Sequence, residues 1–175
     1  MARDDLIRKQ IKRKIAEETQ KDDVIEQGFN RNNWNLLKEI IIEYLSKSLS
    51  KPIDEITKKL TDEFLFQILG RIGEIEYKIL IIRFALYGRT YNLKEIAKEL
   101  KISKREELYR IDVALKRIKF HFEKYENAED LLKSIGYNEK QIEKILIVSN
   151  KLISGEDLDF DDIIFFEKVD NEALL

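Results

Sequence analysis

The chain contains no cysteine, which excludes a disulfide framework, a thiolate metal site and a cysteine nucleophile. Its single histidine, His121, cannot by itself form a histidine-rich metal site. The sequence also has no phosphate-binding glycine loop and no set of nucleophile, histidine and acid of the hydrolase kind. We therefore expect that the protein is not an enzyme and that it uses no metal or organic cofactor.

Long apolar runs are also missing from the chain. The run at residues 79–82 is stopped by Arg83, far short of the roughly 20 residues that a membrane-spanning helix needs. Asp4 and Asp5 follow the first methionine almost at once, where a signal peptide would be basic and then apolar. These absences favour a cytoplasmic protein that makes no membrane contact.

Proline and glycine are scarce, with one proline and six glycines in 175 residues. Few sharp turns favour long helices over a many-turned sheet protein, and apolar side chains recur at spacings of three and four along most of the chain. We therefore predict an all-α fold, a helical bundle with a small helical segment at its C-terminal end. The predicted helices span residues 34–49, 62–72, 74–86, 93–100, 128–135 and 138–153, with a short element from Pro52 and a long helix after Ser103.

Polar residues mark the beginnings of several of these helices. Asn33, Thr61 and Asn92 each precede an apolar stripe, and we predict that they are N-caps. Ser103 is followed three positions later by Glu106, which is the spacing of a capping box.

Two glycines mark helix ends. Gly88 is predicted to close the helix at residues 74–86, and Gly136 to form the turn of a helical hairpin near the C-terminal end. At the N-terminal end, apolar residues at helical spacing within residues 6–15 are surrounded by lysine and arginine, which predicts a short basic helix or arm.

Opposite charges are concentrated in neighbouring parts of the chain, although its net charge is only −2. Residues 78–124 carry 13 basic and 6 acidic side chains, whereas residues 125–175 carry 5 basic and 13 acidic ones. A basic block beside an acidic one is typical of a DNA-contacting module next to a module that does not touch DNA. Clustering of charges on solvated helix faces gives the same counts, and both interpretations stay open here.

Residues 92–118, NLKEIAKELKISKREELYRIDVALKRI, read as two amphipathic helices joined by a very short turn. A helix-turn-helix has this arrangement and lays its second helix in the major groove of DNA. The first helix carries Leu93, Ile96 and Ala97 on one face, and a small side chain such as Ala97 lets the two helices cross closely. The expected buried stripe of the second helix consists of Leu108, Ile111, Leu115, Ile118 and Phe122.

The other positions of the second helix are the candidates for DNA contact. They are Lys104, Arg105, Tyr109, Arg110, Val113, Lys116 and Arg117. Lysine and arginine side chains pair with guanine edges or with phosphates. A charged helical hairpin inside a bundle would show the same pattern, so the residues alone support both interpretations.

Residues 74–119 resemble region 4 of bacterial sigma factors. That family has an apolar helix, a glycine, a bend containing Thr and Tyr, the pattern L-x-E-I-A-x-x-L, a turn ending in Ser, and a basic helix ending A-L-x-x-[IL]. The matching pieces here are residues 79–86, Gly88, Thr90-Tyr91, residues 93–100, Ile102-Ser103 and residues 114–118, and residues 64–72 match the preceding helix. The resemblance covers about a third of the chain. The family has glycine where Lys101 stands, so we expect a left-handed backbone with some strain there.

The resemblance implies a sigma-like transcription factor that binds double-stranded promoter DNA at the −35 element and docks on the RNA polymerase core. From this resemblance together with the charge pattern, we predict an N-terminal helical region with a basic arm (residues 1–60), a region 4-like domain (residues 61–125) and an acidic C-terminal helical segment (residues 126–175). Replacing Arg110 and Arg117 together by alanine is then expected to abolish promoter-specific binding and to leave the fold intact. The alternative is a modulator that binds RNA polymerase or another protein through the same scaffold without reading a DNA sequence.

Acidic residues interleave with phenylalanine and isoleucine in residues 156–175. Such a segment can dock on a regulatory partner or on the basic face of the chain's own helix-turn-helix. It can equally form a last amphipathic helix packed on the body of the protein. If the segment is autoinhibitory, deleting residues 156–175 should tighten DNA binding.

Overall fold

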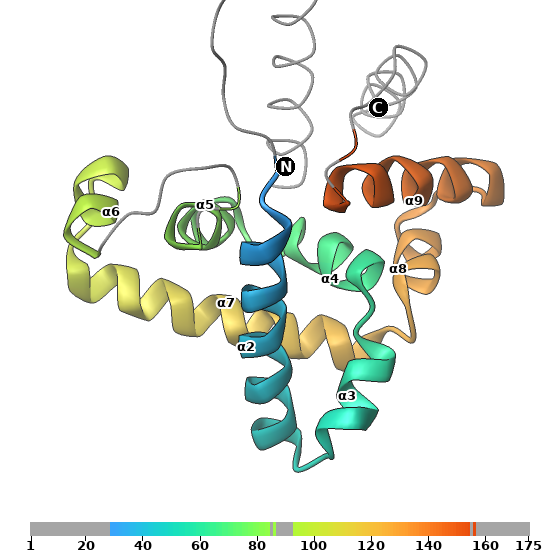
Figure 1. Ribbon diagram of the computed structural model, residues 1–175, viewed down its shortest axis with the longest axis horizontal. Helices are drawn as coiled ribbons and strands as arrows, with labels where there is room; N and C mark the ends of the chain where they lie inside the picture. Colours follow the sequence, from blue (N-terminus) through green and yellow to red (C-terminus); the bar gives the residue numbers. More distant parts are fainter. Residues whose placement is uncertain (1–28, 85, 87–92, 155, 157–175) are drawn as a thin grey trace, which may run out of the picture.

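The computed structural model describes residues 29–84, 86, 93–154 and 156, and every regular element in these ranges is an α-helix (Figure 1). The prediction of an all-α fold is therefore confirmed for the part of the chain described. The helices are α2 (Arg31–Leu49), α3 (Ile53–Lys59), α4 (Asp62–Leu69), α5 (Glu74–Arg83), α6 (Leu93–Leu100), α7 (Lys104–Lys124), α8 (Ala128–Ile135) and α9 (Glu139–Ile153). The predicted basic arm, Gly88, Asn92 and the acidic segment after Glu156 lie outside the described residues.

Local hydrogen bonds set several helix ends where the sequence predicts them. Oγ1 of Thr61 accepts a hydrogen bond from the Phe64 N–H at 3.2 Å and caps α4. The side chain of Asn138 accepts from the Gln141 N–H at 2.9 Å and caps α9. Gly136 ends α8 with a φ of 110°, a left-handed conformation that glycine adopts without strain.

The N-cap of α2 is Asn30, and the prediction of Asn33 is wrong. The Asn30 side chain accepts a hydrogen bond from the Asn33 N–H at 3.0 Å. The backbone N–H of Asn30 donates to the carbonyl of Leu86 at 2.7 Å, so a contact distant in sequence holds this residue. Helices α4 and α5 also end earlier than predicted, at Leu69 and Arg83.

Helix α7 is the longest helix described and runs across the molecule (Figure 1). Its first half contacts α5 and α6, while α2 crosses near its middle and α4 contacts it further along. Helices α8 and α9 form the predicted hairpin and pack on α4, and α3 packs on α2. This arrangement places α6 and the beginning of α7 at one end of the molecule, away from α8 and α9 (Figure 1).

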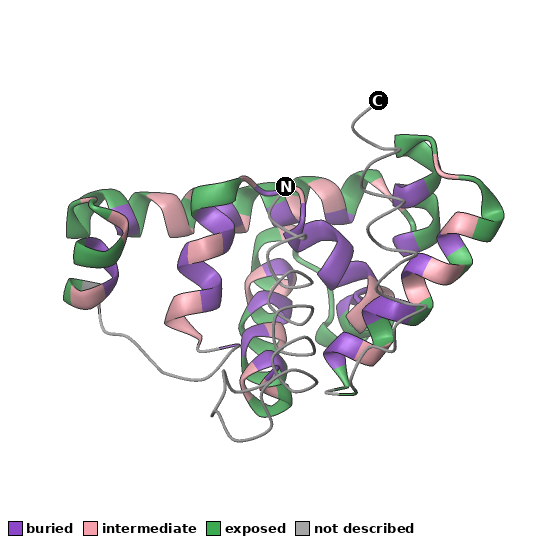
Figure 2. Cartoon of the chain, turned by 90° about the horizontal axis from the view of Figure 1, so that it is seen from above, coloured by how far each residue is buried: buried purple, intermediate pink, exposed green. Residues whose placement is uncertain are grey.

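One apolar core joins α2, α3, α4, α5, α7, α8 and α9, whereas Ile96 and Ala97 of α6 are buried outside it. Trp34, Phe64, Phe66 and Phe122 are each at most 2% exposed, and the ring of Phe64 stacks on that of Phe122 with centroids 6.1 Å apart. Figure 2 shows the buried residues on the faces where the helices meet. Members of this core come from all three segments predicted from the sequence, and the division of the chain at residues 60 and 125 stays a prediction.

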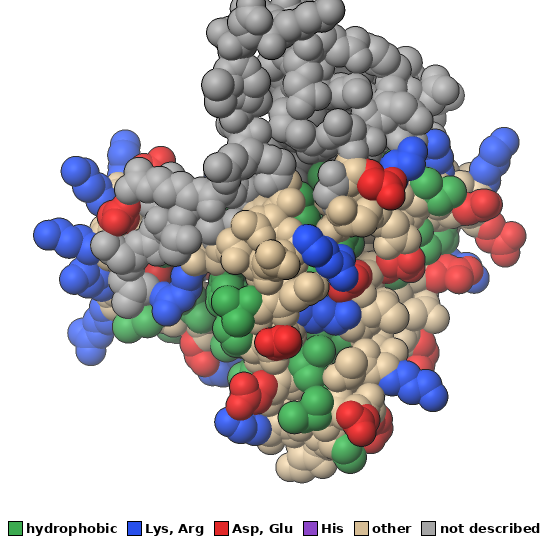
Figure 3. Space-filling view, in the orientation of Figure 1, with side chains coloured by type: hydrophobic (Ala, Val, Ile, Leu, Met, Phe, Trp, Pro, Cys, Tyr) green, Lys and Arg blue, Asp and Glu red, His purple; other side chains and the backbone are tan. Residues whose placement is uncertain are grey.

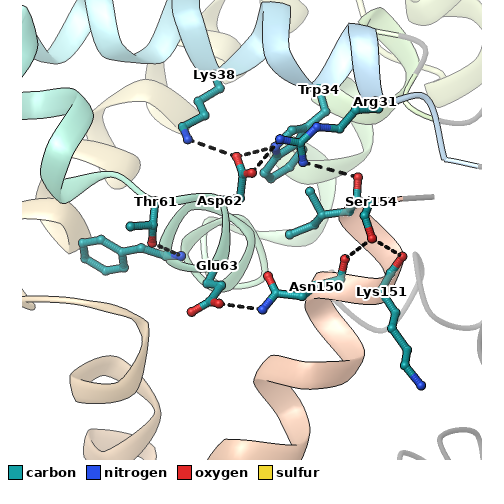
Figure 4. Close-up of polar contacts among 11 residues, drawn as sticks. Arg31, Trp34, Lys38, Thr61, Asp62, Glu63, Asn150, Lys151 and Ser154 are labelled. Carbon is teal, nitrogen blue, oxygen red and sulfur yellow. Dashed lines mark hydrogen bonds and ion pairs between the residues drawn. The ribbon is translucent and has the colours of Figure 1, made fainter. Parts of the chain in front are cut away.

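A polar cluster around Asp62 ties α2 to the beginning of α4 (Figure 4). The Asp62 carboxylate accepts hydrogen bonds from Arg31 at 2.7 Å, from Trp34 Nε1 at 3.0 Å and from Lys38 at 3.0 Å. Arg31 also donates to the carbonyl of Ile153 in α9 at 3.4 Å. Burial acts to raise the pKa of Asp62, but the three hydrogen bonds outweigh it and hold the pKa below its ordinary value. The Asp62 cluster therefore holds α2 against the beginning of α4.

Candidate nucleic-acid interface

Three residues join α6 to α7, and their hydrogen bonds form a Schellman motif. The Ile102 N–H donates to the Ala97 carbonyl at 2.9 Å, and the Lys101 N–H donates to the Lys98 carbonyl at 3.3 Å. Lys101 has a φ of 57°, so the predicted left-handed backbone is confirmed. A lysine in this conformation is strained where glycine would not be.

Helix α7 begins directly after this turn. Oγ of Ser103 accepts a hydrogen bond from the Glu106 N–H at 3.0 Å, which is one half of the predicted capping box. On α6, Ile96 and Ala97 are buried as predicted and α6 packs on α7. The side chain of Leu93, predicted to share their face, lies outside the described residues. The tight turn and the buried face of α6 together fix the direction of the first turns of α7.

The buried face of α7 departs from the predicted stripe near the N-terminal end of the helix. The members of the predicted stripe that are buried or half-buried are Ile111, Leu115, Ile118 and Phe122. Leu108 is instead 54% exposed, and its neighbour Glu107 is completely buried. The prediction for Leu108 is wrong because the beginning of α7 turns Glu107 toward α5, where Arg83 lies 3.7 Å from the Glu107 carboxylate.

Five of the seven predicted DNA-contact residues are exposed. They are Lys104, Arg105, Tyr109, Lys116 and Arg117, while Arg110 and Val113 are half-buried. Figure 3 shows lysine and arginine side chains projecting from the end of the molecule that α6 and the beginning of α7 form. Lys116 pairs with Asp112 one turn earlier at 2.9 Å, a surface ion pair that contributes little to stability. This end of the molecule therefore presents cations to solvent.

Arg110 and Arg117 both turn toward Glu76 of α5. Nη1 of Arg110 lies 2.9 Å from Oε1 of Glu76, and Nη1 of Arg117 lies 3.4 Å from the same oxygen. Arg117 also donates to the carbonyl of Ile72 at 2.6 Å. Glu76 is 3% exposed, so the two arginines replace the water that its carboxylate loses on folding. The hydrogen bond to Glu76 raises the pKa of Arg110. We refer to Glu76, Arg110 and Arg117 as the α5–α7 latch.

Gly73 gives the latch its space. This residue is the N-cap of α5 and has a φ of 112°. A Cβ at this position would lie 2.6 Å from Nη1 of Arg117 and would also collide with the carboxylate of Glu76. The absence of a side chain at Gly73 therefore lets the carboxylate and the guanidinium meet above the backbone.

Glu107 is a second buried carboxylate beneath the start of α7. Burial raises its pKa, and the positive charge of Arg83 offsets only part of that effect. Neither carboxylate oxygen accepts a hydrogen bond from any residue that the structure describes. An ionised carboxylate in this position is therefore unfavourable.

Reasoning from the sequence missed Gly73, Glu76 and Glu107 as parts of this region. Glu76 stands next to the buried Tyr77 in a helix with many apolar residues, and a buried carboxylate generally needs a cationic partner. That pattern could have identified Glu76. It could not have identified its partner, because Arg110 lies 34 positions further along the chain.

Comparison of the chain with protein-family models, with curated proteins and with solved structures finds no match. Among the helices of the described residues, none combines the length and the apolar character needed to cross a membrane. Within the same residues, no three side chains of His, Asp or Glu are placed so that they could hold a metal ion.

Proposed function

We propose that the protein is a sigma-like transcription factor that binds promoter DNA through α6 and α7 and contacts RNA polymerase. The observation that supports this proposal best is the junction of these two helices. The Schellman turn around Lys101 and the Ser103 cap bring the exposed N-terminal turns of α7 to the end of the molecule. A recognition helix contacts base edges with its N-terminal residues in this way.

In this proposal, the exposed side chains of α7 contact different parts of the DNA. Lys104, Arg105 and Tyr109 contact phosphates and base edges, and Lys116 contacts a phosphate further along the groove. Arg110 and Arg117 act mainly by positioning, since the latch to Glu76 already holds their guanidinium groups. Val113 lies half-buried at the margin of the contact surface.

Contact with RNA polymerase rests on the resemblance of residues 74–119 to sigma region 4. The same resemblance assigns α6 and α7 to the −35 element of promoters. A cytoplasmic location and the absence of a cofactor follow from the same assignment.

Two observations on α7 support a second candidate function. The latch engages Arg110 and Arg117, and Glu106 and Asp112 place exposed negative charges among the cations. Both observations favour a modulator that binds RNA polymerase or another protein without reading a DNA sequence. Such a protein would retain DNA only through cations and phosphates, and this retention would weaken steeply with salt.

Sequencing the DNA that the full chain retains from a random duplex pool separates the two functions. A sigma-like factor enriches one sequence resembling a −35 element, and this enrichment persists at moderate salt. Retention that is blind to sequence and disappears as salt rises supports the modulator and contradicts the transcription-factor proposal.

Variants of the exposed cations test whether α7 makes the contact. We expect the double substitution Lys104→Ala and Arg105→Ala to weaken binding of the enriched duplex at least tenfold and to lower the slope of log affinity against log salt by up to about 2. Lys133→Ala with Lys140→Ala removes two exposed cations from α8 and α9 and serves as the matched control. Equal losses in the two double variants would remove α7 from the proposed contact.

The double substitution Arg110→Ala and Arg117→Ala does not give a clean test of DNA contact. It would leave the buried carboxylate of Glu76 without its two cations, and a buried unpaired charge destabilises a fold. A loss of DNA binding in this variant would therefore combine lost contacts with lost structure.

A further inference from the structure

Two large side chains with apolar surface stand exposed next to each other on the second turn of α7. Leu108 is 54% exposed and Tyr109 is 62% exposed. Their neighbour Glu107 is completely buried, so the helix buries a carboxylate and presents a leucine to solvent. Exposing the leucine forgoes the stabilisation that its burial would bring, and a ligand that covers Leu108 would recover it.

Exposed basic side chains outnumber acidic ones around Leu108, where Lys104, Arg105 and Lys116 lie near Glu106 and Asp112. Side chains three and four positions apart share a helix face, which places Arg105, Leu108, Tyr109 and Asp112 in one row. Lys104 is exposed one turn before Leu108. Lys116, which is also exposed, pairs with Asp112 and so offsets the one negative charge of the row. The apolar surface of Leu108 is thus framed by groups that suit an anionic ligand.

This combination fits the major groove of duplex DNA better than the surface of another protein. A stable protein interface covers about 800 Å² on each partner, and two adjacent side chains among cations provide only a small part of that area. In the major groove, cations meet phosphates while an apolar side chain meets the C5-methyl group of thymine. Thymine is the base that presents an apolar group there.

We propose that Leu108 reads the C5-methyl group of a thymine in the bound duplex, with Tyr109 shielding the contact from water. This inference rests on the function proposed above, and it names the base pair and the residue that contribute specificity. The recognised sequence then contains a T·A pair beneath the second turn of α7, flanked by phosphates that Lys104 and Arg105 contact. Removing only the methyl group should weaken binding about fourfold, which is the effect of leaving one methyl-sized group unburied.

Replacement of thymine by deoxyuridine tests the contact, because it removes the methyl group and leaves base pairing intact. The duplex that the full chain enriches from a random pool is resynthesised with deoxyuridine at each thymine in turn. We expect one position at which the unsubstituted chain binds the deoxyuridine duplex about fourfold more weakly. Leu108→Ala should bind the two duplexes equally at that position. Leu36→Ala removes a leucine that is 49% exposed on α2 and should keep the fourfold difference.

The outcomes separate this inference from the function on which it rests. An enriched duplex that tolerates deoxyuridine at every position, or that contains no thymine, overturns the reading of the methyl group and leaves sequence-specific binding standing. A methyl effect that persists in Leu108→Ala also overturns the assignment to Leu108. If the pool yields no enriched sequence, both this inference and the transcription-factor proposal fail.

Discussion

Nη1 of Arg110 lies 2.9 Å from Oε1 of Glu76, and the two residues are 34 positions apart in the chain. The Arg110 side chain is 29% exposed, whereas that of Glu76 is 3% exposed. The two partners are therefore not equivalent. If Glu76 is lost, water can solvate the arginine, but if the arginines are lost, the carboxylate stays buried without a cation.

This asymmetry predicts the effect of each substitution on stability. We expect Arg110→Ala with Arg117→Ala to lower the free energy of unfolding by about 3 kcal/mol, and Glu76→Gln to lower it by clearly less. Urea unfolding of both variants at pH 7 measures the difference. A Glu76→Gln variant that loses as much stability as the double arginine variant would contradict this account of the latch.

Gly73 and Gly136 can be compared to test how tightly the latch is packed. Both have φ near 110°, but ψ is 147° at Gly73 and 6° at Gly136, so alanine is strained at both positions and more strained at Gly73. A Cβ at Gly136 meets nothing within 4 Å, whereas one at Gly73 would displace Glu76 and Arg117. Gly73→Ala should therefore destabilise the protein more than Gly136→Ala in thermal unfolding. Equal losses would contradict both the larger backbone strain at Gly73 and the collision of its Cβ with the latch.

Lys101 offers a substitution that should stabilise the protein. Its left-handed φ of 57° strains a lysine, so Lys101→Gly should raise the free energy of unfolding by about 0.5–1 kcal/mol. Lys98→Gly lies within α6 and should lower it by about 1 kcal/mol. Thermal unfolding of the two glycine variants should therefore show shifts of opposite sign, and a loss of stability in both would refute the strain at Lys101.

Because of Asp62, the free energy of unfolding should fall as the solution is acidified. The pKa of Asp62 is lowered in the folded protein, so its stabilisation is complete above the unfolded-state pKa of about 3.9 and is lost as the pH falls through the folded-state value. Asp62→Asn should lower the free energy of unfolding by about 1–2 kcal/mol at pH 7. The gap between the variant and the unsubstituted protein should close below pH 3.9, as measured by urea unfolding across the pH range. If the difference in stability between Asp62→Asn and the unsubstituted protein grew in acid, the hydrogen bonds of Asp62 would be excluded as its cause.

Glu107 has the opposite pH dependence. Its pKa is raised by burial, so the unfavourable effect of its charge is complete above the folded-state pKa and disappears as the pH falls below the ordinary value. Glu107→Gln should therefore stabilise the protein at pH 7, and the gain should shrink as the solution is acidified. Urea unfolding at several pH values measures the gain, and destabilisation at pH 7 would show that the carboxylate is needed.

The sequence by itself determined the helical class and many of the helix ends. Thr61 and Ser103 cap the helices predicted for them, and Gly136 turns the hairpin as predicted. These features could be predicted because the hydrogen bonds of a cap or a turn join residues only a few positions apart. The left-handed conformation of Lys101 was expected because the resemblance proposed for residues 74–119 places glycine at this turn.

Only the tertiary structure decided which face of α7 is buried and which side chains pair across helices. The sequence pattern places Leu108 inside, yet the crossing of α7 with α5 turns Glu107 inward and leaves Leu108 exposed. Glu76 of α5 pairs with Arg110 of α7. Asn30 rather than Asn33 is the N-cap of α2, and its backbone N–H donates to the carbonyl of Leu86. Each of these outcomes depends on the angle and rotation at which distant helices meet. A single helix can carry residues at helical spacing on more than one face, so the sequence pattern alone does not decide which face is buried.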